Sequence, residues 1–373
     1  MAEPVMLRAL AMLVLAALAS PATAQTPARS APPSPVNMVL YHQPGAPVSV
    51  AVSGDAGLAG RPVRADMPVR IASISKLVTA LGVMRLVDQG QLDLDRDVSA
   101  YLGWPLRNPA FPDMPVTLRM LLSHTASLTD AAGYYLPLDG KLRPLFEDPA
   151  AWDPDHAPGS GHFHYANSAS PVIAAVMERV TGQRFDMIMQ QQVFDPLALR
   201  ACFNWSGCSR QQRDKAITLL RPDGALAKDP PLAGGEAECA FVPAADGRCD
   251  PAFYVLGENG STFSPQGGLR VSARELMVIG KLLASDDRDF LSAQAWQEMR
   301  AVQWRASDQN TDGPQQWALG LELQPGGWIG HSGNAYGLRA GLWANRQTGE
   351  VKVTIVTMVD EATPEGACLK HCP

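Results

Sequence analysis

The sequence lacks several features that mark common classes of protein. It has no run rich in lysine or arginine, and its net charge is -6, so a nucleic-acid partner is not expected. Beyond residue 24 it has no apolar stretch long enough to cross a membrane. It has no internal repeat, and its six cysteines lack the spacing of a zinc module. With 46% hydrophobic and 18% charged residues, the 373-residue chain is typical of a globular enzyme with a large core.

The first 24 residues have the pattern of a secretory signal peptide. Arg8 supplies the positive start, residues 9–19 the apolar middle, and Ala22-Thr23-Ala24 the small-residue cleavage site. An uncleaved anchor is the alternative, although the apolar run is short for a membrane span. We therefore expect a periplasmic or secreted protein with no membrane span after signal removal.

The cysteines fit an oxidising compartment because they occur as near neighbours in the chain. Local pairing is our prediction, although six cysteines allow 15 connectivities and free buried thiols are the alternative. The predicted pairs are Cys202 with Cys208, Cys239 with Cys249, and Cys368 with Cys372.

The hydrophobic pattern changes along the chain and indicates the organisation of the fold. Alternating segments near both ends predict strands of one antiparallel sheet, and helical patterns dominate between them. We expect an α/β (α+β) fold in which the sheet is flanked by helices and joined to a mainly helical lobe. The predicted parts are a flexible mature N-terminus at 25–46, a sheet lobe at about 47–72 and 265–360, a helical lobe at about 73–264, and a tail at 361–373.

Particular helices and strands follow from the same patterns. Helices are expected at 74–88, after a Thr117 cap at 118–122, at 170–180, and after a Ser272 cap at about 273–283. Strands are expected at 48–52, 317–323, 328–331, 338–343 and 351–358, with a hairpin turn at 347–349.

Ser73 and Lys76 form a Ser-x-x-Lys motif at the start of the apolar helix 74–88. Their spacing places both side chains on one helix face, where the helix N-terminus favours a developing negative charge. Burial of an amine favours its neutral form, which can accept a proton from a hydroxyl. Ser73 is therefore a candidate nucleophile and Lys76 its base. The alternative is a capping serine beside a lysine whose stem packs on the surface.

Two later stretches could complete such a site. In the stretch 158–167 a tight turn precedes Tyr165 and Asn167; a tyrosine beside an ammonium can act as acid or base, and an asparagine can bind an amide or ester. In the stretch 330–334 the N–H of Asn334 could join that of Ser73 in an oxyanion hole. The alternative for the first stretch is that Tyr165 is a buried aromatic residue and Asn167 a helix cap. The alternative for the second is that His331 is an ordinary histidine at the end of a strand.

These three stretches, in this order, resemble the serine β-lactamase and penicillin-binding protein superfamily, and most of all class C β-lactamases with the related esterases and D-amino-acid peptidases. The resemblance runs from about residue 47 to 360. It implies acyl transfer through an acyl-serine with Ser73, Lys76 and Tyr165 as catalytic residues and no cofactor or metal. It also implies substrate binding by Asn167, His331, Ser332, Gly333 and Asn334. The expected partner is a small-molecule or peptide substrate.

The sequence departs from the family pattern at His331, which stands where β-lactamases carry the lysine of Lys-Thr-Gly. Much of a histidine's charge is absent at neutral pH, so a substrate carboxylate loses a partner. An ester or amide substrate is therefore favoured over a β-lactam or a D-alanyl-D-alanine peptide. Ala126-Ser127 also stands where the family usually has Ser-Gly.

Three other functions remain as alternatives. One is an α/β-hydrolase, although the stretch 330–334 lacks the second glycine of the nucleophile motif of that family. A metal hydrolase could use the histidines and aspartates before Tyr165, and a non-catalytic protein could keep the penicillin-binding fold. The metal candidates are Asp153, Asp155, His156, His162 and His164.

Overall fold

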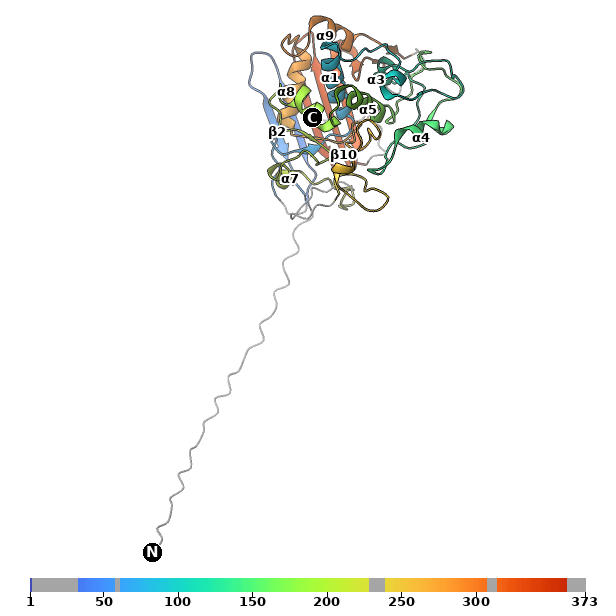
Figure 1. The fold of residues 1–373 in the computed structure, drawn as a ribbon. Coiled ribbons are helices and arrows are strands. Elements are labelled where there is room, and N and C mark those ends of the chain that lie inside the picture. The colour runs from blue at the N-terminus through green and yellow to red at the C-terminus, as the bar shows by residue number, and fades with distance from the viewer. Residues whose placement is uncertain (2–32, 58–60, 228–238, 307–313, 361–373) are drawn as a thin grey trace. The chain divides into compact units, whose positions relative to one another are not determined.

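The structure is a computed structural model, shown as a ribbon in Figure 1. It describes residue 1 and residues 33–57, 61–227, 239–306 and 314–360. The rest of the predicted signal, Cys368, Cys372 and the tail from 361 lie outside the described residues. Within the described ranges, no helix has the length and apolar character that a membrane span requires.

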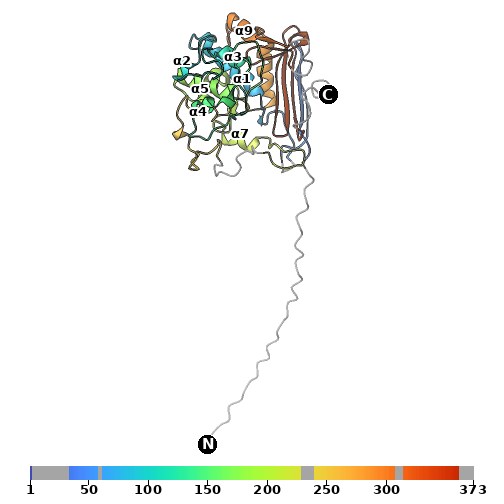
Figure 2. The ribbon, with the colours of Figure 1, turned by 90° about the vertical axis from the view of Figure 1, so that its right-hand side faces the viewer.

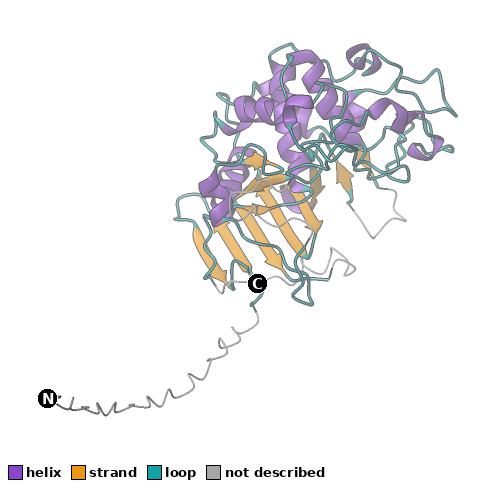
Figure 3. Ribbon diagram, turned by 60° about the horizontal axis from the view of Figure 1, so that its bottom comes forward, coloured by secondary structure: helices purple, strands orange, loops and turns teal. Residues whose placement is uncertain are grey.

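An antiparallel sheet of eight strands forms one layer (Figures 2 and 3). Because β1 pairs with both β2 and β11, the first and last described strands lie side by side. The last strand alternates between buried and half-buried residues, as its sequence predicts. In spatial order the strands are β2 (Ser49–Ser53), β1 (Asn37–His42), β11 (Val351–Thr357), β10 (Leu338–Asn345), β9 (Trp328–Ala335), β8 (Glu322–Gln324), β7 (Gln316–Trp317) and β6 (Trp304–Arg305).

The helices lie on one side of this sheet, and α8 packs directly against β1, β10 and β11 (Figure 2). A second sheet has three strands in the order β3-β5-β4. Its strand β3 comes just before α1 in the chain. The helices are α1 (Ile74–Asp88), α2 (Ser99–Leu102), α3 (Leu118–Leu122), α4 (Leu142–Glu147), α5 (Ala169–Thr181), α6 (Phe185–Met189), α7 (Arg210–Lys215), α8 (Ala273–Ala284) and α9 (Ala293–Arg300). The short elements are η1 (Pro149–Ala151), η2 (Gln190–Phe194), η3 (Pro251–Phe253), η4 (Pro325–Gly327), β3 (Val69–Arg70), β4 (Cys202–Phe203) and β5 (Leu269–Val271).

The helix that begins beside Ser73 is the most enclosed element of the fold. All residues of α1 except Arg85, Val87 and Asp88 are buried, since it contacts β9, β10, α6, η2 and α9. The predicted caps are also present: the Thr117 side chain accepts the Met120 N–H, and Ser272 forms a capping box at the start of α8. The position of α1 between sheet and helices fixes where Ser73 can lie.

Two expectations from the sequence are wrong. The segment 25–46, predicted as a flexible terminus, contains β1, whose alternate residues Met38 and Leu40 are buried between the strands and α8. The predicted single strand at 317–323 is two short strands, β7 and β8, joined by a tight turn. Gly320 takes a left-handed φ of 68° in that turn, and a Cβ there would lie 2.5 Å from the Ala80 side chain of α1.

The disulfides Cys202–Cys208 and Cys239–Cys249 are present, so two of the three predicted local pairings are confirmed. They lie in the irregular region between α6 and α8, which has few regular elements to hold it. The third predicted pair, Cys368 with Cys372, lies outside the described residues.

A buried carboxylate holds the end of α5 in place. Glu178 is fully buried and accepts hydrogen bonds from the Phe185 N–H at 2.8 Å, the Gly257 N–H at 2.8 Å and the Tyr254 hydroxyl at 2.6 Å. Burial raises the pKa of Glu178 to about 7, and the three donors only partly offset that rise.

We expect the stability contributed by Glu178 to fall as the pH rises. Its folded-state pKa of about 7 lies above the ordinary 4.5, so the contribution is complete below pH 4.5 and is lost towards pH 7. The free energy of unfolding of the wild type, relative to Glu178→Gln, should drop by up to ~3 kcal/mol over that range. Urea unfolding at pH 5 and pH 8 measures this. The surface variant Glu147→Gln is the control, and parallel wild-type and Glu178→Gln curves would contradict the assignment.

Candidate active site

Ser73 lies at the first turn of α1 with its hydroxyl directed to Lys76. Its side chain does not cap the helix; instead Ser73 Oγ accepts a hydrogen bond from Lys76 Nζ at 3.1 Å. The preceding residue, Ala72, has a φ of 48°, an uncommon left-handed conformation for a residue with a Cβ. The simple capping alternative for Ser73 is therefore wrong.

Lys76 is the centre of the hydrogen-bond network. Its side chain is only 6% exposed, and Nζ also donates to Asn167 Oδ1 at 2.7 Å and to the carbonyl oxygen of Gln266 at 3.1 Å. With Ser73, these acceptors use the three N–H bonds of an ammonium. The alternative of a lysine on the surface is therefore wrong as well.

Asn167 is oriented by a carboxylate behind it. The Asn167 side-chain amide donates to Asp130 Oδ2 at 2.8 Å, and the backbone N–H groups of Asn167 and Ser168 donate to Asp130 at 3.0 and 2.9 Å. Since the amide nitrogen is used by Asp130, the amide oxygen faces Lys76. Asp130 was not singled out from the sequence.

Tyr165 lies at the exposed side of Lys76. Its ring centroid is 4.8 Å from Lys76 Nζ, and 37% of the residue is exposed. The His124 ring lies 4.5 Å from the Tyr165 ring, and the Ala166 N–H donates to His124 Nδ1 at 3.3 Å. The predicted residues Ser73, Lys76, Tyr165 and Asn167 therefore meet in space, and His124 is an additional neighbour that the sequence did not indicate.

The β9 segment passes close to the backbone that leads into Ser73. A Cβ on Gly333 would lie 2.3 Å from the carbonyl oxygen of Ile71, so a larger residue does not fit there. The adjoining two-residue turn has left-handed Tyr336 and Gly337, as in a type I′ hairpin.

The hairpin register also sets the direction of the backbone donors. Residues that flank a two-residue turn exchange both hydrogen bonds, and the pattern then alternates along the pair. Asn334 opposes Arg339 in a pair without hydrogen bonds, so the N–H of Asn334 points away from β10. Strand β8 pairs with β9 only from Trp328 to Gly330.

His331 is a predicted substrate-binding residue whose side chain the structure buries. It is 2% exposed and lies 5.3 Å from the Trp317 ring and 6.3 Å from the Tyr165 ring. Nδ1 lies 2.5 Å from the carbonyl oxygen of Ser332, so Nδ1 carries the proton in the neutral ring. Burial and the nearby Lys76 charge lower the pKa of His331 to about 3, and the ring is neutral at pH 7.

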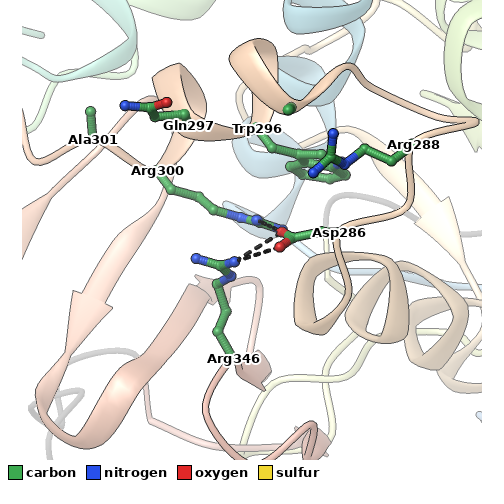
Figure 4. A pocket seen from close by; sticks show the side chains of 8 residues that line it. Asp286, Arg288, Trp296, Gln297, Arg300, Ala301 and Arg346 are labelled. Carbon is green, nitrogen blue, oxygen red and sulfur yellow. Dashed lines mark hydrogen bonds and ion pairs between the residues drawn. The ribbon is translucent and has the colours of Figure 1, made fainter.

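A larger cavity lies elsewhere, at α9 and the β10–β11 turn (Figure 4). Its volume is about 430 Å³, and none of the predicted site residues lines it. Asp286 forms ion pairs with Arg300 and with Arg346, and Figure 4 shows both guanidinium groups turned towards it. Asp286 therefore neutralises part of the positive charge around this cavity. A cavity of about 10 Å³ adjoins Lys76 and His124, enough for about one water.

Comparisons with known proteins identify the family of this chain. A family model described as Beta-lactamase matches residues 37–369. Esterase EstB of Burkholderia gladioli is 36% identical over 39% of this chain and 40% of that protein. The D-alanyl-D-alanine-carboxypeptidase/endopeptidase AmpH of Escherichia coli K12 is 30% identical over 36% of each chain. The aligned part spans about two fifths of the length of these curated relatives.

Solved structures support the same fold. The penicillin-binding protein homologue from Pyrococcus abyssi has a TM-score of 0.65 at 20% identity, over 90% of this chain and 73% of that one. The D-amino acid amidase from Ochrobactrum anthropi SV3 in complex with D-phenylalanine has a TM-score of 0.64 at 18% identity, over 89% of each chain. At these identities the likeness concerns the fold alone.

The neutral state of His331 gives a prediction for pH dependence. Because its pKa is about 3, His331 does not titrate between pH 5 and pH 8. The variant His331→Gln should therefore lower ester turnover by less than about tenfold and keep the shape of the pH profile of kcat/KM. Steady-state rates on a p-nitrophenyl ester measure this. An inflection between pH 5 and pH 8 that disappears in the variant would contradict the assignment.

Proposed function

The chain belongs to the beta-lactamase family. From this premise we propose that it is a serine hydrolase that cleaves an ester or amide through an acyl intermediate on Ser73. The observation that carries the proposal is the contact of Ser73 Oγ with Lys76 Nζ, which Asn167 and Gln266 hold in place. A hydroxyl beside a fixed amine is the arrangement of an activated nucleophile.

The proposed reaction has two acyl-transfer steps. Ser73 Oγ attacks the substrate carbonyl carbon while its proton passes to the Tyr165 phenolate, which the neighbouring Lys76 ammonium stabilises. The N–H groups of Ser73 and Asn334 stabilise the negative charge on the carbonyl oxygen. When the tetrahedral intermediate collapses, the same pair gives the proton to the leaving alcohol or amine, the substrate C–O or C–N bond breaks, and the acyl–serine remains. Water then attacks the acyl group, gives a proton to the pair, and restores the Ser73 hydroxyl as the acid leaves.

The remaining residues have supporting roles in this proposal. Asn167 offers its amide to the substrate and keeps Lys76 in position, and Asp130 in turn fixes Asn167. Gly333 allows a substrate to lie close to β9, and Ser332 and Asn334 supply polar groups along that edge. His331 packs beside the aromatic residues Tyr165 and Trp317.

The substrate class follows from charge and from the aromatic surroundings. A neutral His331 offers no cation to a substrate carboxylate, whereas the ring pair Phe163 and Trp304, 4.4 Å apart, adjoins Trp317 near the site. We favour a neutral ester with an apolar group. A β-lactamase or D-alanyl-D-alanine carboxypeptidase activity is the alternative, supported by the similarity to the relative named as a carboxypeptidase.

The proposed location is the periplasm or the exterior of the cell. The two disulfides support it, because such bonds persist in oxidising compartments. The signal-peptide pattern of the first 24 residues agrees with this location.

The acyl intermediate can be tested by covalent labelling. A fluorophosphonate probe should label the wild type, while Ser73→Ala should remain unlabelled and lose ester turnover by at least about 10³-fold, as nucleophile removal does elsewhere. Ser49→Ala, on an exposed strand, is the control and should behave as the wild type. Mass spectrometry locates the adduct. Wild type that neither labels nor turns over any activated ester would instead support a non-catalytic protein.

The substrate class can be tested by comparing nitrocefin, p-nitrophenyl esters and D-alanyl peptides. We expect kcat/KM to be highest on the esters. His331→Lys should raise the ratio of nitrocefin to ester turnover about tenfold, because a hydrogen bond to a charged group contributes ~1.5 kcal/mol. If nitrocefin or the peptide is the better wild-type substrate and His331→Lys changes little, the charge argument is wrong.

A further inference from the structure

The loop between η1 and α5 brings two imidazoles to a single carboxylate oxygen. His156 Nδ1 lies 2.8 Å from Asp153 Oδ2, and His162 Nε2 lies 3.5 Å from the same oxygen. The two rings are parallel, with centroids 3.6 Å apart and an angle of 7° between their planes. Three side chains from different turns of one loop therefore converge on one point.

The spacing of these atoms suits a small transition-metal ion. One ligand atom from each of Asp153, His156 and His162 lies within 4.8 Å of the others. A tetrahedral zinc ion with bonds of 2.0–2.2 Å separates its ligand atoms by roughly 3.4 Å, so the atoms are close enough, and the two rings must rotate out of their parallel stack to direct both nitrogens at one ion. Two nitrogen donors and one carboxylate favour zinc over magnesium, which prefers oxygen ligands.

Hydrogen bonds to Ser127 and Asn108 hold the backbone that carries these ligands. Ser127 Oγ donates to the carbonyl oxygen of His156 at 2.6 Å, and the Asp153 N–H donates to the carbonyl oxygen of Ser127 at 2.9 Å. The Asn108 side chain donates to the Asp153 carbonyl oxygen at 2.7 Å and to Ser127 Oγ at 2.7 Å. Ser127 stands at one of the departures from the family pattern, with a left-handed φ of 63°.

The loop is also fixed on the side of His162. The Gly159 N–H donates to the Thr125 carbonyl oxygen at 2.9 Å, and the His164 N–H donates to the His124 carbonyl oxygen at 2.9 Å. The side chains themselves remain open to solvent, since His156 is 44% and His162 38% exposed. An ion can enter from outside and keep water in its fourth position.

We propose that Asp153, His156 and His162 bind one divalent transition-metal ion, with zinc as the preferred ion, at a site separate from the Ser73 nucleophile. The ion replaces the proton that now joins His156 to Asp153 and connects the two ends of the loop. His162 lies three residues before Tyr165, so the bound ion steadies the segment that delivers Tyr165 to Lys76. This role differs from a metal hydrolase, because the ion takes no part in the attack on the substrate.

Binding can be measured on the full-length protein after treatment with a chelator. Titration calorimetry with zinc chloride should give one ion per chain, and zinc should raise the Tm. Magnesium chloride should do neither. Equal affinity for both ions, or no zinc binding at all, would overturn the proposal without touching the serine mechanism.

Matched variants locate the ion within the loop. Asp153→Asn and the double variant His156→Ala/His162→Ala should each weaken zinc binding at least about 10- to 100-fold, the loss that even outer partners of a metal cause. Asp155→Asn and His164→Ala, which alter neighbouring exposed residues, should bind as the wild type does. Loss of binding in these controls, or its persistence in the first two variants, would place the ion elsewhere.

Activity separates the two roles of a bound ion. Chelation should lower the Tm and leave most of the ester turnover and all of the fluorophosphonate labelling of Ser73. Turnover that is abolished by the chelator and restored by zinc would contradict a purely steadying role and favour a metal hydrolase. Labelling without zinc binding would leave the serine function standing and remove this proposal alone.

Discussion

The placement of one amine inside the fold controls the arrangement of the proposed active site. Lys76 loses nearly all contact with water, so each of its N–H bonds must find an acceptor within the protein. The three acceptors come from the start of α1, from the segment before α5 and from the segment before β5. The lysine therefore unites segments that are far apart in the sequence.

The surrounding architecture makes that burial feasible. The sheet covers one side of α1 and the other helices cover the rest, so the start of the helix, including Lys76, is enclosed by protein. Hydrogen bonds behind the site add orientation, as Asp130 does for Asn167. Neutral His331 fills the space under Tyr165 at little electrostatic cost, whereas a second ammonium beside Lys76 would need a partner.

Local patterns in the sequence were enough to predict the elements that carry the site. The spacing of Ser73 and Lys76 on an apolar helix requires a shared face, and the capping residues mark helix starts without reference to the rest of the fold. The meeting of these residues with Tyr165 and β9 was expected from the family resemblance. Contacts such as those of Asp130, His124 and the Gln266 carbonyl could not be predicted, since a hydrogen bond across more than 30 residues leaves no periodic signal. The strand β1 was missed because nearby prolines concealed its short alternation.

The pairing of β1 with β11 has a consequence for how the chain acquires its structure. The edge formed by β1 and β2 has no neighbour until residues near the other end of the polypeptide are available. During synthesis, the early strands must therefore remain unpaired until most of the chain has emerged. Sequence separation on this scale makes assembly slow. A chaperone that shields unpaired strand edges would bind to these early strands.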